Sequence, residues 1–404
     1  MSMLDVTHGD THGDTLGDTA GIDLFQILRD GRPRTRSELA SLTGLARSTV
    51  ASRVESLVRL GLVRPVGDAV STGGRPSSQF ALNASGRVVL GVDVGASHVR
   101  IAVTDLSGKI LAQDSVAMEV AEGPAAVLAW VATAGRELLK KANAASTDLL
   151  GIGVGLPGPV EHATGLPIDP PIMPGWDRYD VPQNLGEQFG VPVLVDNDVN
   201  IMALGERAAS WPHIDHFIFV KVATGIGSGV ISGGLLQRGA QGIAGDIGHV
   251  YVPQGDDVPC RCGNKGCLEA LAAGPAIART LRAAGLDVES SADVIALVKA
   301  GNTDAIRAVR EAGRTIGQVL TACVSIINPA VIVLGGSIAQ AGEHLLAGAR
   351  EVVYARSMPL ATGQLQISNS RAGANAGVLG ASMLAIHHAL SPERVDALLA
   401  STAR

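Results

Sequence analysis

Apolar residues recur at helical spacing in three short segments near the start of the chain. The first is Leu24–Leu28, and the second follows Thr35-Arg36-Ser37-Glu38, a sequence typical of a helix capping box. The third spans residues 46–60 and ends at Gly61. A Thr43-Gly44 pair between the second and third segments predicts a tight turn. Helix, glycine-containing turn and helix together predict a helix-turn-helix.

Two strands are predicted after these helices, at residues 62–66 and 78–82, and the glycine-rich loop 71–76 between them would form a wing. We therefore assign residues 22–83 to a winged helix-turn-helix domain. Its short polar and cationic side chains suit the grooves of double-stranded DNA. They are Arg47, Ser48, Thr49, Ser52 and Arg53 on the third helix, and Arg75 beside Gly74 in the wing. The alternative is a helical hairpin that contacts another protein.

From residue 88 the pattern changes to short apolar runs of the kind that form buried strands. Strands are expected at residues 88–93, 99–104, 110–118, 149–154 and 191–195. A helix is expected at residues 123–141, and a similar strand–glycine–strand pattern restarts at residues 216–222. The economical interpretation is an α/β chain with two related lobes around a cleft.

Composition agrees with a large folded core. Hydrophobic residues make up 46% of the 404 residues and charged residues 17%, which excludes global disorder. Apolar runs stay short of the ~18 residues that a membrane span needs, and the N-terminus lacks a basic-then-apolar signal. We therefore expect a cytoplasmic protein that does not contact a membrane. Residues 1–21 repeat Thr-His-Gly-Asp and are expected to form a disordered leader.

The net charge of −6 is unevenly distributed along the chain. Residues 22–83 hold nine Arg against five acidic residues and carry +4, whereas residues 1–21 carry −4 and the chain from residue 84 carries −6. A small basic module on an acidic body is typical of a DNA-binding domain joined to a sensing or catalytic domain.

Three of the four cysteines lie within eight residues and predict a metal site. His249, Cys260, Cys262 and Cys267 supply one imidazole and three thiolates, the four ligands of a closed, structural Zn²⁺ site. The alternative is a set of reduced cysteines without a metal. Cys323 lies in an apolar helical run and is expected to be a core residue.

Two glycine-containing loops have the composition to cradle phosphates through backbone N–H groups. One surrounds Gly95, and the other is Thr224-Gly225-Ile226-Gly227-Ser228-Gly229. Asp198 follows a strand and has the position of a general base for a hydroxyl that attacks a phosphoryl group. The alternatives are glycine turns that merely join strands and an Asp198 carboxylate that caps a helix.

Several short motifs, in their order along the chain, resemble one known family, the ROK proteins, named for repressors, open reading frames and kinases. The motifs are Asp93-Val94-Gly95-Ala96-Ser97, Gly155-Leu156-Pro157-Gly158, Asp196-Asn197-Asp198, Ala244-Gly245-Asp246-Ile247-Gly248-His249, Cys260-Arg261-Cys262-Gly263-Asn264-Lys265-Gly266-Cys267-Leu268-Glu269 and Leu334-Gly335-Gly336. The resemblance implies an actin-like (ribonuclease H-like), two-lobed sugar-kinase fold. The first lobe would hold residues 84–205 and about 375–404, and the second, with the zinc site, residues 206–374.

The resemblance also implies roles for individual residues. Sugar contacts would come from Asn197, Asp198, Asp246, His249 and Glu269. Asp246 stands where the family usually has the longer Glu. Remnants of the phosphate loops would be Asp93, Gly95, Ser97, Thr224, Gly225 and Gly227.

Some positions depart from the kinase branch of the family. Where family kinases read Asp-x-Gly-Gly-Thr-Lys, this chain has Ala96, Ser97 and His98, and Ala223 stands where the second loop usually opens with Gly. An added Cβ can block the approach of a phosphate to the backbone. The Asn that family kinases often place before Pro-Gly-Trp would fall near Ile172, so the pocket is expected to take a bulkier or less polar sugar derivative.

These features favour a sugar-responsive transcriptional regulator, expected to be a repressor. It would bind an operator in double-stranded DNA as a homodimer or a dimer of dimers, and a sugar or sugar phosphate in the cleft. The alternative function is an ATP-dependent, glucokinase-like sugar kinase that uses Mg²⁺ and Asp198 as its catalytic base. A zinc-stabilised scaffold without a ligand would leave Asn197, Asp198 and Glu269 unexplained.

Overall fold

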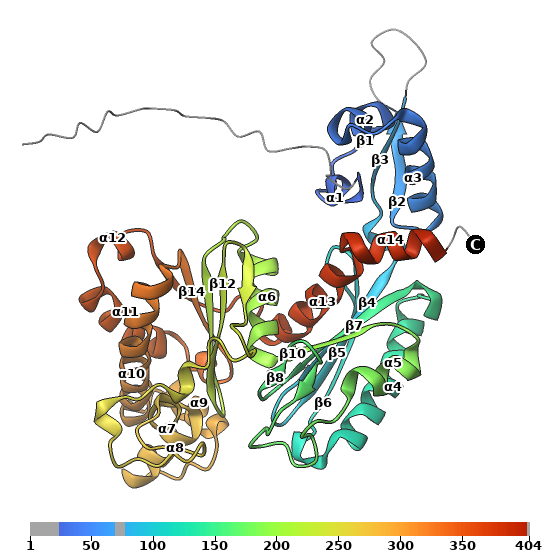
Figure 1. The fold of residues 1–404 in the computed structure, drawn as a ribbon. Coiled ribbons are helices and arrows are strands. Elements are labelled where there is room, and N and C mark those ends of the chain that lie inside the picture. Colours follow the sequence, from blue (N-terminus) through green and yellow to red (C-terminus); the bar gives the residue numbers. More distant parts are fainter. Residues whose placement is uncertain (1–23, 69–76, 402–404) are drawn as a thin grey trace, which may run out of the picture. The chain divides into compact units, whose positions relative to one another are not determined.

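The computed structural model describes residues 24–68 and 77–401, which belong to two compact units (Figure 1). The smaller unit holds the described residues up to Gly86 together with those from Leu390 onward, and the larger unit holds Arg87–Ala389. The repeat-containing leader and the wing residues Gly74 and Arg75 lie outside the described residues.

The smaller unit combines a helix-turn-helix with an antiparallel sheet whose strands lie in the order β1-β3-β2. Its elements are α1 (Leu24–Leu28), β1 (Arg34–Thr35), α2 (Arg36–Thr43), α3 (Arg47–Arg59), β2 (Val63–Asp68), β3 (Ser78–Leu82) and α14 (Pro392–Ser401). The three predicted helices and both predicted strands are present. α3 buries Val50, Val54 and Leu57, which recur at helical spacing and face the core of this unit.

Local hydrogen bonds explain where α2 begins and ends. The Thr35 hydroxyl accepts a hydrogen bond from the Glu38 N–H (3.2 Å), and the Glu38 carboxylate accepts one from the Thr35 N–H (2.6 Å). This reciprocal pair confirms the predicted capping box. Gly44 ends the helix with a φ of 70°, in the left-handed region that glycine adopts at little cost. The chain then turns and begins α3 at Arg47.

The C-terminal residues divide between the two units. α13 (Ala376–Ala389) belongs to the larger unit, whereas α14 belongs to the smaller one. Leu390 and Val395 are buried there, and the Gln26 side chain donates a hydrogen bond to the Leu390 carbonyl (2.8 Å). Residues from about 375 to 404 were instead expected to lie together in the first lobe. The smaller unit is therefore built from both ends of the chain.

The first sheet of the larger unit has five strands in the order β6-β5-β4-β7-β10. They are β4 (Val88–Val94), β5 (Val99–Asp105), β6 (Ile110–Val116), β7 (Leu149–Leu156) and β10 (Val193–Asn197). Neighbours among β4, β5 and β6 are antiparallel, whereas β7 and β10 run parallel to β4. β4 is buried at every position because α4 (Pro124–Lys141) and α5 (Val181–Phe189) cover one face of the sheet and α13 covers the other (Figure 1). A short pair of strands, β8 (Val160–Glu161) and β9 (Leu166–Pro167), lies beside β10.

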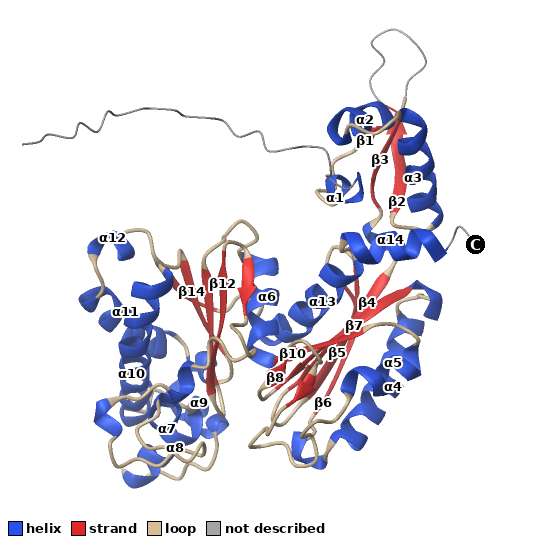
Figure 2. Ribbon diagram, in the orientation of Figure 1, coloured by secondary structure: helices blue, strands red, loops and turns tan. Residues whose placement is uncertain are grey.

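The second sheet repeats this topology in the order β13-β12-β11-β14-β15. Figure 2 labels two of its strands, β12 and β14. Its strands are β11 (Phe217–Val222), β12 (Ile226–Ser232), β13 (Leu235–Gln237), β14 (Val331–Gly335) and β15 (Gln366–Asn369). Its helices are α7 (Leu268–Ala272), α8 (Gly274–Ala283), α9 (Ser291–Lys299), α10 (Thr303–Ile327), α11 (Glu343–Arg356) and α12 (Pro359–Thr362). In each sheet, three antiparallel strands are followed by two parallel ones. The repeat confirms the expected α/β fold with two related lobes.

Helix α6 (Asp198–Ser210) carries the chain from the first sheet to the second and packs directly on α13. A Cβ added to Gly380 would lie 1.5 Å from the Ile201 carbonyl oxygen, and one added to Gly205 would lie 2.0 Å from the Ala376 carbonyl oxygen. The two helix backbones therefore touch, and no side chain fits between them. This packing holds α6 on α13, and the N-terminus of α6 directly follows the end of β10.

Candidate functional site

A cavity of about 570 Å³ lies in the larger unit and brings together most of the predicted site residues. Its size is within the range of small-molecule pockets. The walls come from the loop after β4, the start of α6, the β11–β12 loop and the start of α7. Ten of the residues predicted to contact the sugar or a phosphate line it: Asp93, Ser97, Asn197, Asp198, Thr224, Gly225, Gly227, Asp246, His249 and Glu269. Gly95 is not among the lining residues.

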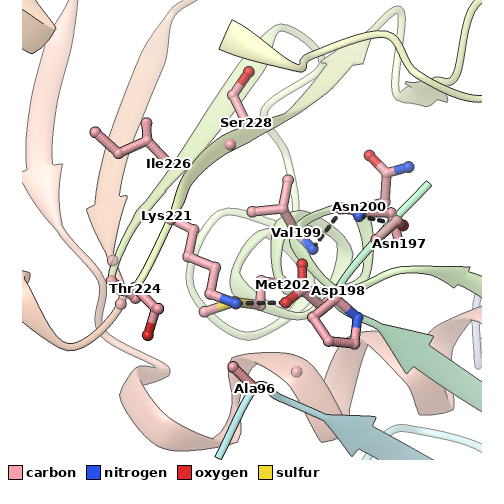
Figure 3. Close-up of a pocket in the computed structure, with 18 of the residues that line it drawn as sticks. Ala96, Asn197, Asp198, Val199, Asn200, Met202, Lys221, Thr224, Ile226 and Ser228 are labelled. Carbon is pink, nitrogen blue, oxygen red and sulfur yellow. Dashed lines mark hydrogen bonds and ion pairs between the residues drawn. The ribbon is translucent and has the colours of Figure 1, made fainter. Parts of the chain in front are cut away.

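Asn197 and Asp198 have different tasks at the start of α6 (Figure 3). Asn197 is the helix cap: its side-chain oxygen accepts a hydrogen bond from the Val199 N–H (3.0 Å), and its side-chain nitrogen donates one to the Gly158 carbonyl (2.9 Å). Asp198 is the first helical residue, so its carboxylate does not serve as the cap. Asp198 is only 5% exposed, yet it lines the cavity.

Lys221 of β11 pairs with Asp198, an interaction that the sequence analysis missed (Figure 3). The Lys221 ammonium donates a hydrogen bond to Asp198 Oδ2, and both residues line the cavity. Burial lowers the pKa of Lys221, but the charges of Asp198 and Asp93 and the Asp198 hydrogen bond outweigh it, so the pKa lies above its ordinary value. The lysine therefore remains a cation. The available signal was one charged residue in an otherwise apolar strand.

His98, in the loop between β4 and β5, and Arg100, near the start of β5, surround the first of the two predicted phosphate loops. A Cβ added to Gly95 would lie 2.2 Å from the His98 ring, so the imidazole covers the backbone of this glycine. The Arg100 guanidinium donates to His98 Nε2 (2.7 Å), and the two side chains lie 3.7 and 3.6 Å from the Asp93 carboxylate. The side chains that fill this loop also explain why Gly95 does not reach the cavity.

Glu269 joins the start of α7 to the β11–β12 loop. Its carboxylate accepts a hydrogen bond from the Ile226 N–H (3.0 Å), and a Cβ added to Gly225 would lie 2.6 Å from the same oxygen. Gly225 is therefore required for close approach of this carboxylate. Asp246 and His249 are exposed side chains that line the neighbouring part of the cavity.

The four predicted metal ligands lie together beside this part of the cavity. Ligand atoms of His249, Cys260, Cys262 and Cys267 all lie within 4.8 Å of one another. Cys262 Sγ is 3.6 Å from Cys267 Sγ, and Cys260 Sγ is 3.7 Å from His249 Nδ1. Tetrahedral Zn–S bonds of about 2.3 Å would place sulfurs roughly 3.8 Å apart, so the donor set fits a tetrahedral metal. This cluster has the ligands to bind a metal ion.

The thiols of this cluster differ in their acidity without a metal. The Asn264 N–H is the largest influence on Cys262 and lowers its pKa to about 7. Burial and the neighbouring thiols raise the pKa of Cys267 to about 12. A bound cation would favour the thiolate form of all three cysteines.

In the smaller unit, the predicted DNA contacts lie at the start of α3. Arg47, Ser48, Thr49 and Ser52 are exposed, and Arg53 is half-buried. The opposite face of α3 is held in the core by Val50 and Val54.

Two family profiles match the chain. The ROK family profile matches residues 89–388, and the IclR helix-turn-helix domain profile matches residues 21–67. Because the ROK match covers more than half of the chain, the protein belongs to the ROK family. None of the helices in the described ranges is long and apolar enough to cross a membrane.

Relatives are found in both branches of this family. The chain is 30% identical over 369 residues to a xylose repressor from Bacillus spizizenii, which covers 91% of this chain and 94% of the repressor. It is 30% identical over 315 residues to a glucokinase from Halalkalibacterium halodurans, covering 74% and 95% of the two chains. The fold is similar to that of a ROK family transcriptional regulator described as a homologue of the E. coli MLC protein, with a TM-score of 0.79, 24% identity and coverage of 94% and 97%.

Proposed function

We propose that this protein is a DNA-binding transcriptional repressor whose DNA affinity changes when a sugar binds in the cavity. The main support for the proposal is that one chain contains both a helix-turn-helix domain and a ROK domain with a ligand-sized cavity. The xylose repressor aligns over both domains, whereas the glucokinase aligns over 74% of the chain. A role at DNA would place the protein in the cytoplasm.

The DNA contacts are proposed at the exposed start of α3. Arg47 has the reach and geometry for a guanine edge or a phosphate, and the short hydroxyls of Ser48, Thr49 and Ser52 allow close approach to the major groove. Arg53 would reach the same groove, and Arg75 and Gly74 of the wing the minor groove. Two half-sites on an operator require two such helices, so we propose a homodimer or a dimer of such dimers.

The sugar is proposed to bind near Asn197, Asp198, Asp246, His249 and Glu269. The metal is proposed to be Zn²⁺, which four ligands would hold without an open position, so that it has a structural task. His249 would serve both sites. In this way the metal would hold one wall of the sugar pocket in place.

Sugar kinase activity is the second candidate, favoured by the glucokinase relative and by Asp198 in the cavity. Three features argue against it. The first phosphate loop is filled by His98, Ala223 adds a Cβ to the second loop, and the Asp198 carboxylate is paired with Lys221. The Lys221 ammonium already occupies one oxygen of the carboxylate that would have to accept the hydroxyl proton.

Two assays on the full chain separate the candidates. In the first, the protein selects from a pool of random DNA duplexes, and we expect enrichment of one sequence that binds with nanomolar affinity or better. In the second, ADP release is followed with Mg²⁺, ATP and a panel of sugars, and we expect none above background. Sugar-dependent ADP release that disappears in Asp198→Asn, together with no enriched DNA sequence, would replace the repressor by the kinase.

A further inference from the structure

Lys221 is the one charged residue on the otherwise apolar strand β11, and its partly buried side chain lines the cavity. Side chains alternate between the two faces of a strand, so Lys221 shares a face of β11 with Phe217 and Phe219. Both phenylalanines pack in one apolar cluster with Ala203 of α6. Lys221 continues this face toward the start of α6, where Asp198 lies.

The neighbouring strands leave room for this lysine. Across the sheet, Lys221 is paired with Gly227 on β12 and with Gly335 on β14. Residues paired in this way lie on the same face of a sheet, and neither glycine has a side chain to cover the ammonium group. The Lys221 side chain keeps 21% of its surface exposed and the Asp198 side chain 7%. The pair is held by the fold but remains open to the cavity.

We propose that Lys221 is a specificity-determining residue that reads the ligand together with Asp198, an inference that rests on the proposed sugar-sensing function. Asp198 accepts a hydrogen bond from one sugar hydroxyl, and Lys221 donates one to the oxygen of the neighbouring hydroxyl. A donor and an acceptor held side by side match two adjacent hydroxyls, because each hydroxyl both donates and accepts. The preferred ligand is therefore a sugar with a free vicinal diol.

The pairing of Lys221 with Asp198 also allows the cavity to bind a sugar hydroxyl without activating it for phosphoryl transfer. In a phosphoryl transfer, the carboxylate would have to take the hydroxyl proton as the oxygen attacks. Here the raised pKa of Lys221 keeps a cation on the carboxylate. The hydroxyl is bound but stays protonated, which suits a sensor.

The test uses the full chain, Lys221→Met and, as a matched control, Lys299→Met, whose lysine is exposed in the last turn of α9. The probes are the aldopentoses and aldohexoses, including D-xylose and D-glucose, with their N-acetylamino and 6-phosphate derivatives. For the sugar that binds wild type best by calorimetry, we expect Lys221→Met to raise Kd about tenfold or more, as loss of a charge-assisted hydrogen bond does. Lys299→Met should leave Kd unchanged.

Monodeoxy forms of that sugar distinguish a direct contact from general disturbance of the pocket. One deoxy form should bind wild type about as weakly as the parent sugar binds Lys221→Met. Lys221→Met should then bind this deoxy form and the parent sugar with equal affinity. If Lys221→Met does not fold, the double variant Lys221→Met/Asp198→Asn, which removes both charges together, is used instead. It too should bind the parent sugar and that deoxy form with equal affinity.

The outcomes identify which claim fails. An unchanged Kd in Lys221→Met would overturn the role of Lys221 while the sensing function stands. So would a result in which, for every deoxy sugar, the loss of affinity from Lys221→Met multiplies with the loss from the missing hydroxyl. If no sugar of the panel binds wild type, the proposed sensing function itself is wrong, and the role of Lys221 falls with it.

Discussion

At the scale of single residues, charge pairing decides what the cavity can do. Asp198 has the place of a kinase base, yet its carboxylate is almost completely buried and neutralised by Lys221. The Asp93 carboxylate lies 3.7 Å from the Arg100 guanidinium, at ion-pair distance. The carboxylates that a kinase would use for a nucleophile and a metal–nucleotide complex are thus occupied by cations of this chain.

Replacing Asp198 by Asn tests this charge pairing. The change leaves Lys221 without its anion, and breaking a buried pair costs about 3–5 kcal/mol, so we expect a lower free energy of unfolding in urea. Because Lys221 is partly exposed, the loss should lie at the lower end of that range. Adding Lys221→Met should recover most of it. A loss that is equally large in the double variant would show that the two residues are not coupled.

The metal ligands give a second prediction at this scale. Cys262→Ser removes one of four ligands from a closed site, so we expect metal analysis to fall from one zinc per chain in wild type to a small fraction of that. The thermal midpoint should fall as well, because the loop that holds the ligands joins α7 to the second sheet. Cys323→Ser, which changes a partly buried cysteine outside the cluster, is the control. Wild-type protein without zinc, and with a melting point that chelators do not change, would contradict the zinc site.

At the scale of elements, α6 begins at the cavity and is hydrogen-bonded to the segment that leads the chain back to the first sheet. The Glu206 carboxylate is fully buried and accepts hydrogen bonds from the Ser370 hydroxyl (2.5 Å) and from the N–H groups of Arg371 (2.9 Å) and Ala372 (3.0 Å). These residues follow β15 and precede α13. The Glu206 carboxylate therefore joins the two segments that connect the sheets, α6 and residues 370–372.

Glu206→Gln should weaken this junction. The amide keeps one acceptor oxygen but presents N–H groups to backbone donors, which leaves buried groups unsatisfied at about 1–3 kcal/mol each. We expect a lower free energy of unfolding and faster hydrogen exchange at Arg371 and Ala372. Glu137→Gln, an exposed glutamate on α4, is the matched control and should have no effect. Exchange rates that match those of wild type would contradict the clamp.

The recognition helix gives a prediction for DNA binding. Arg47→Ala should weaken binding to the selected duplex by about 1–3 kcal/mol if the guanidinium contacts a base, with relaxed preference at one position. Arg59→Ala changes an exposed arginine in the last turn of the same helix and should have a much smaller effect. Equal losses in both variants, with folding intact, would indicate a general charge effect rather than recognition by the start of α3.

The elements were largely predictable from the sequence, and the pairs that define the site were not. Hydrophobic spacing and the Thr35 capping box were enough to predict α2, α3 and the two strands that follow, because these signals are local. Lys221 and Asp198 are 23 residues apart and come from different elements, so their contact depends on the packing of α6 on β11. The placement of α14 likewise depends on a contact between the two ends of the chain, as in the bond from Gln26 to Leu390.

At the scale of the whole molecule, sugar sensing requires that a sugar shifts the protein between two states with different DNA affinity. A ligand shifts such an equilibrium only by its differential affinity for the two states. A change of this kind would require a hinge in the two segments that connect the sheets, α6 and the segment after β15. Both segments contribute residues to the cavity lining.

The most direct measurement is the Kd of the full chain for its selected DNA duplex, with and without a saturating sugar, at one fixed salt concentration. A coupling free energy of about 1–3 kcal/mol corresponds to a change of roughly 5- to 150-fold, and we expect a change of that size with at least one sugar that binds the cavity. By linkage, the duplex should change the sugar affinity by the same factor. A sugar that binds tightly yet leaves the DNA affinity unchanged would contradict the account.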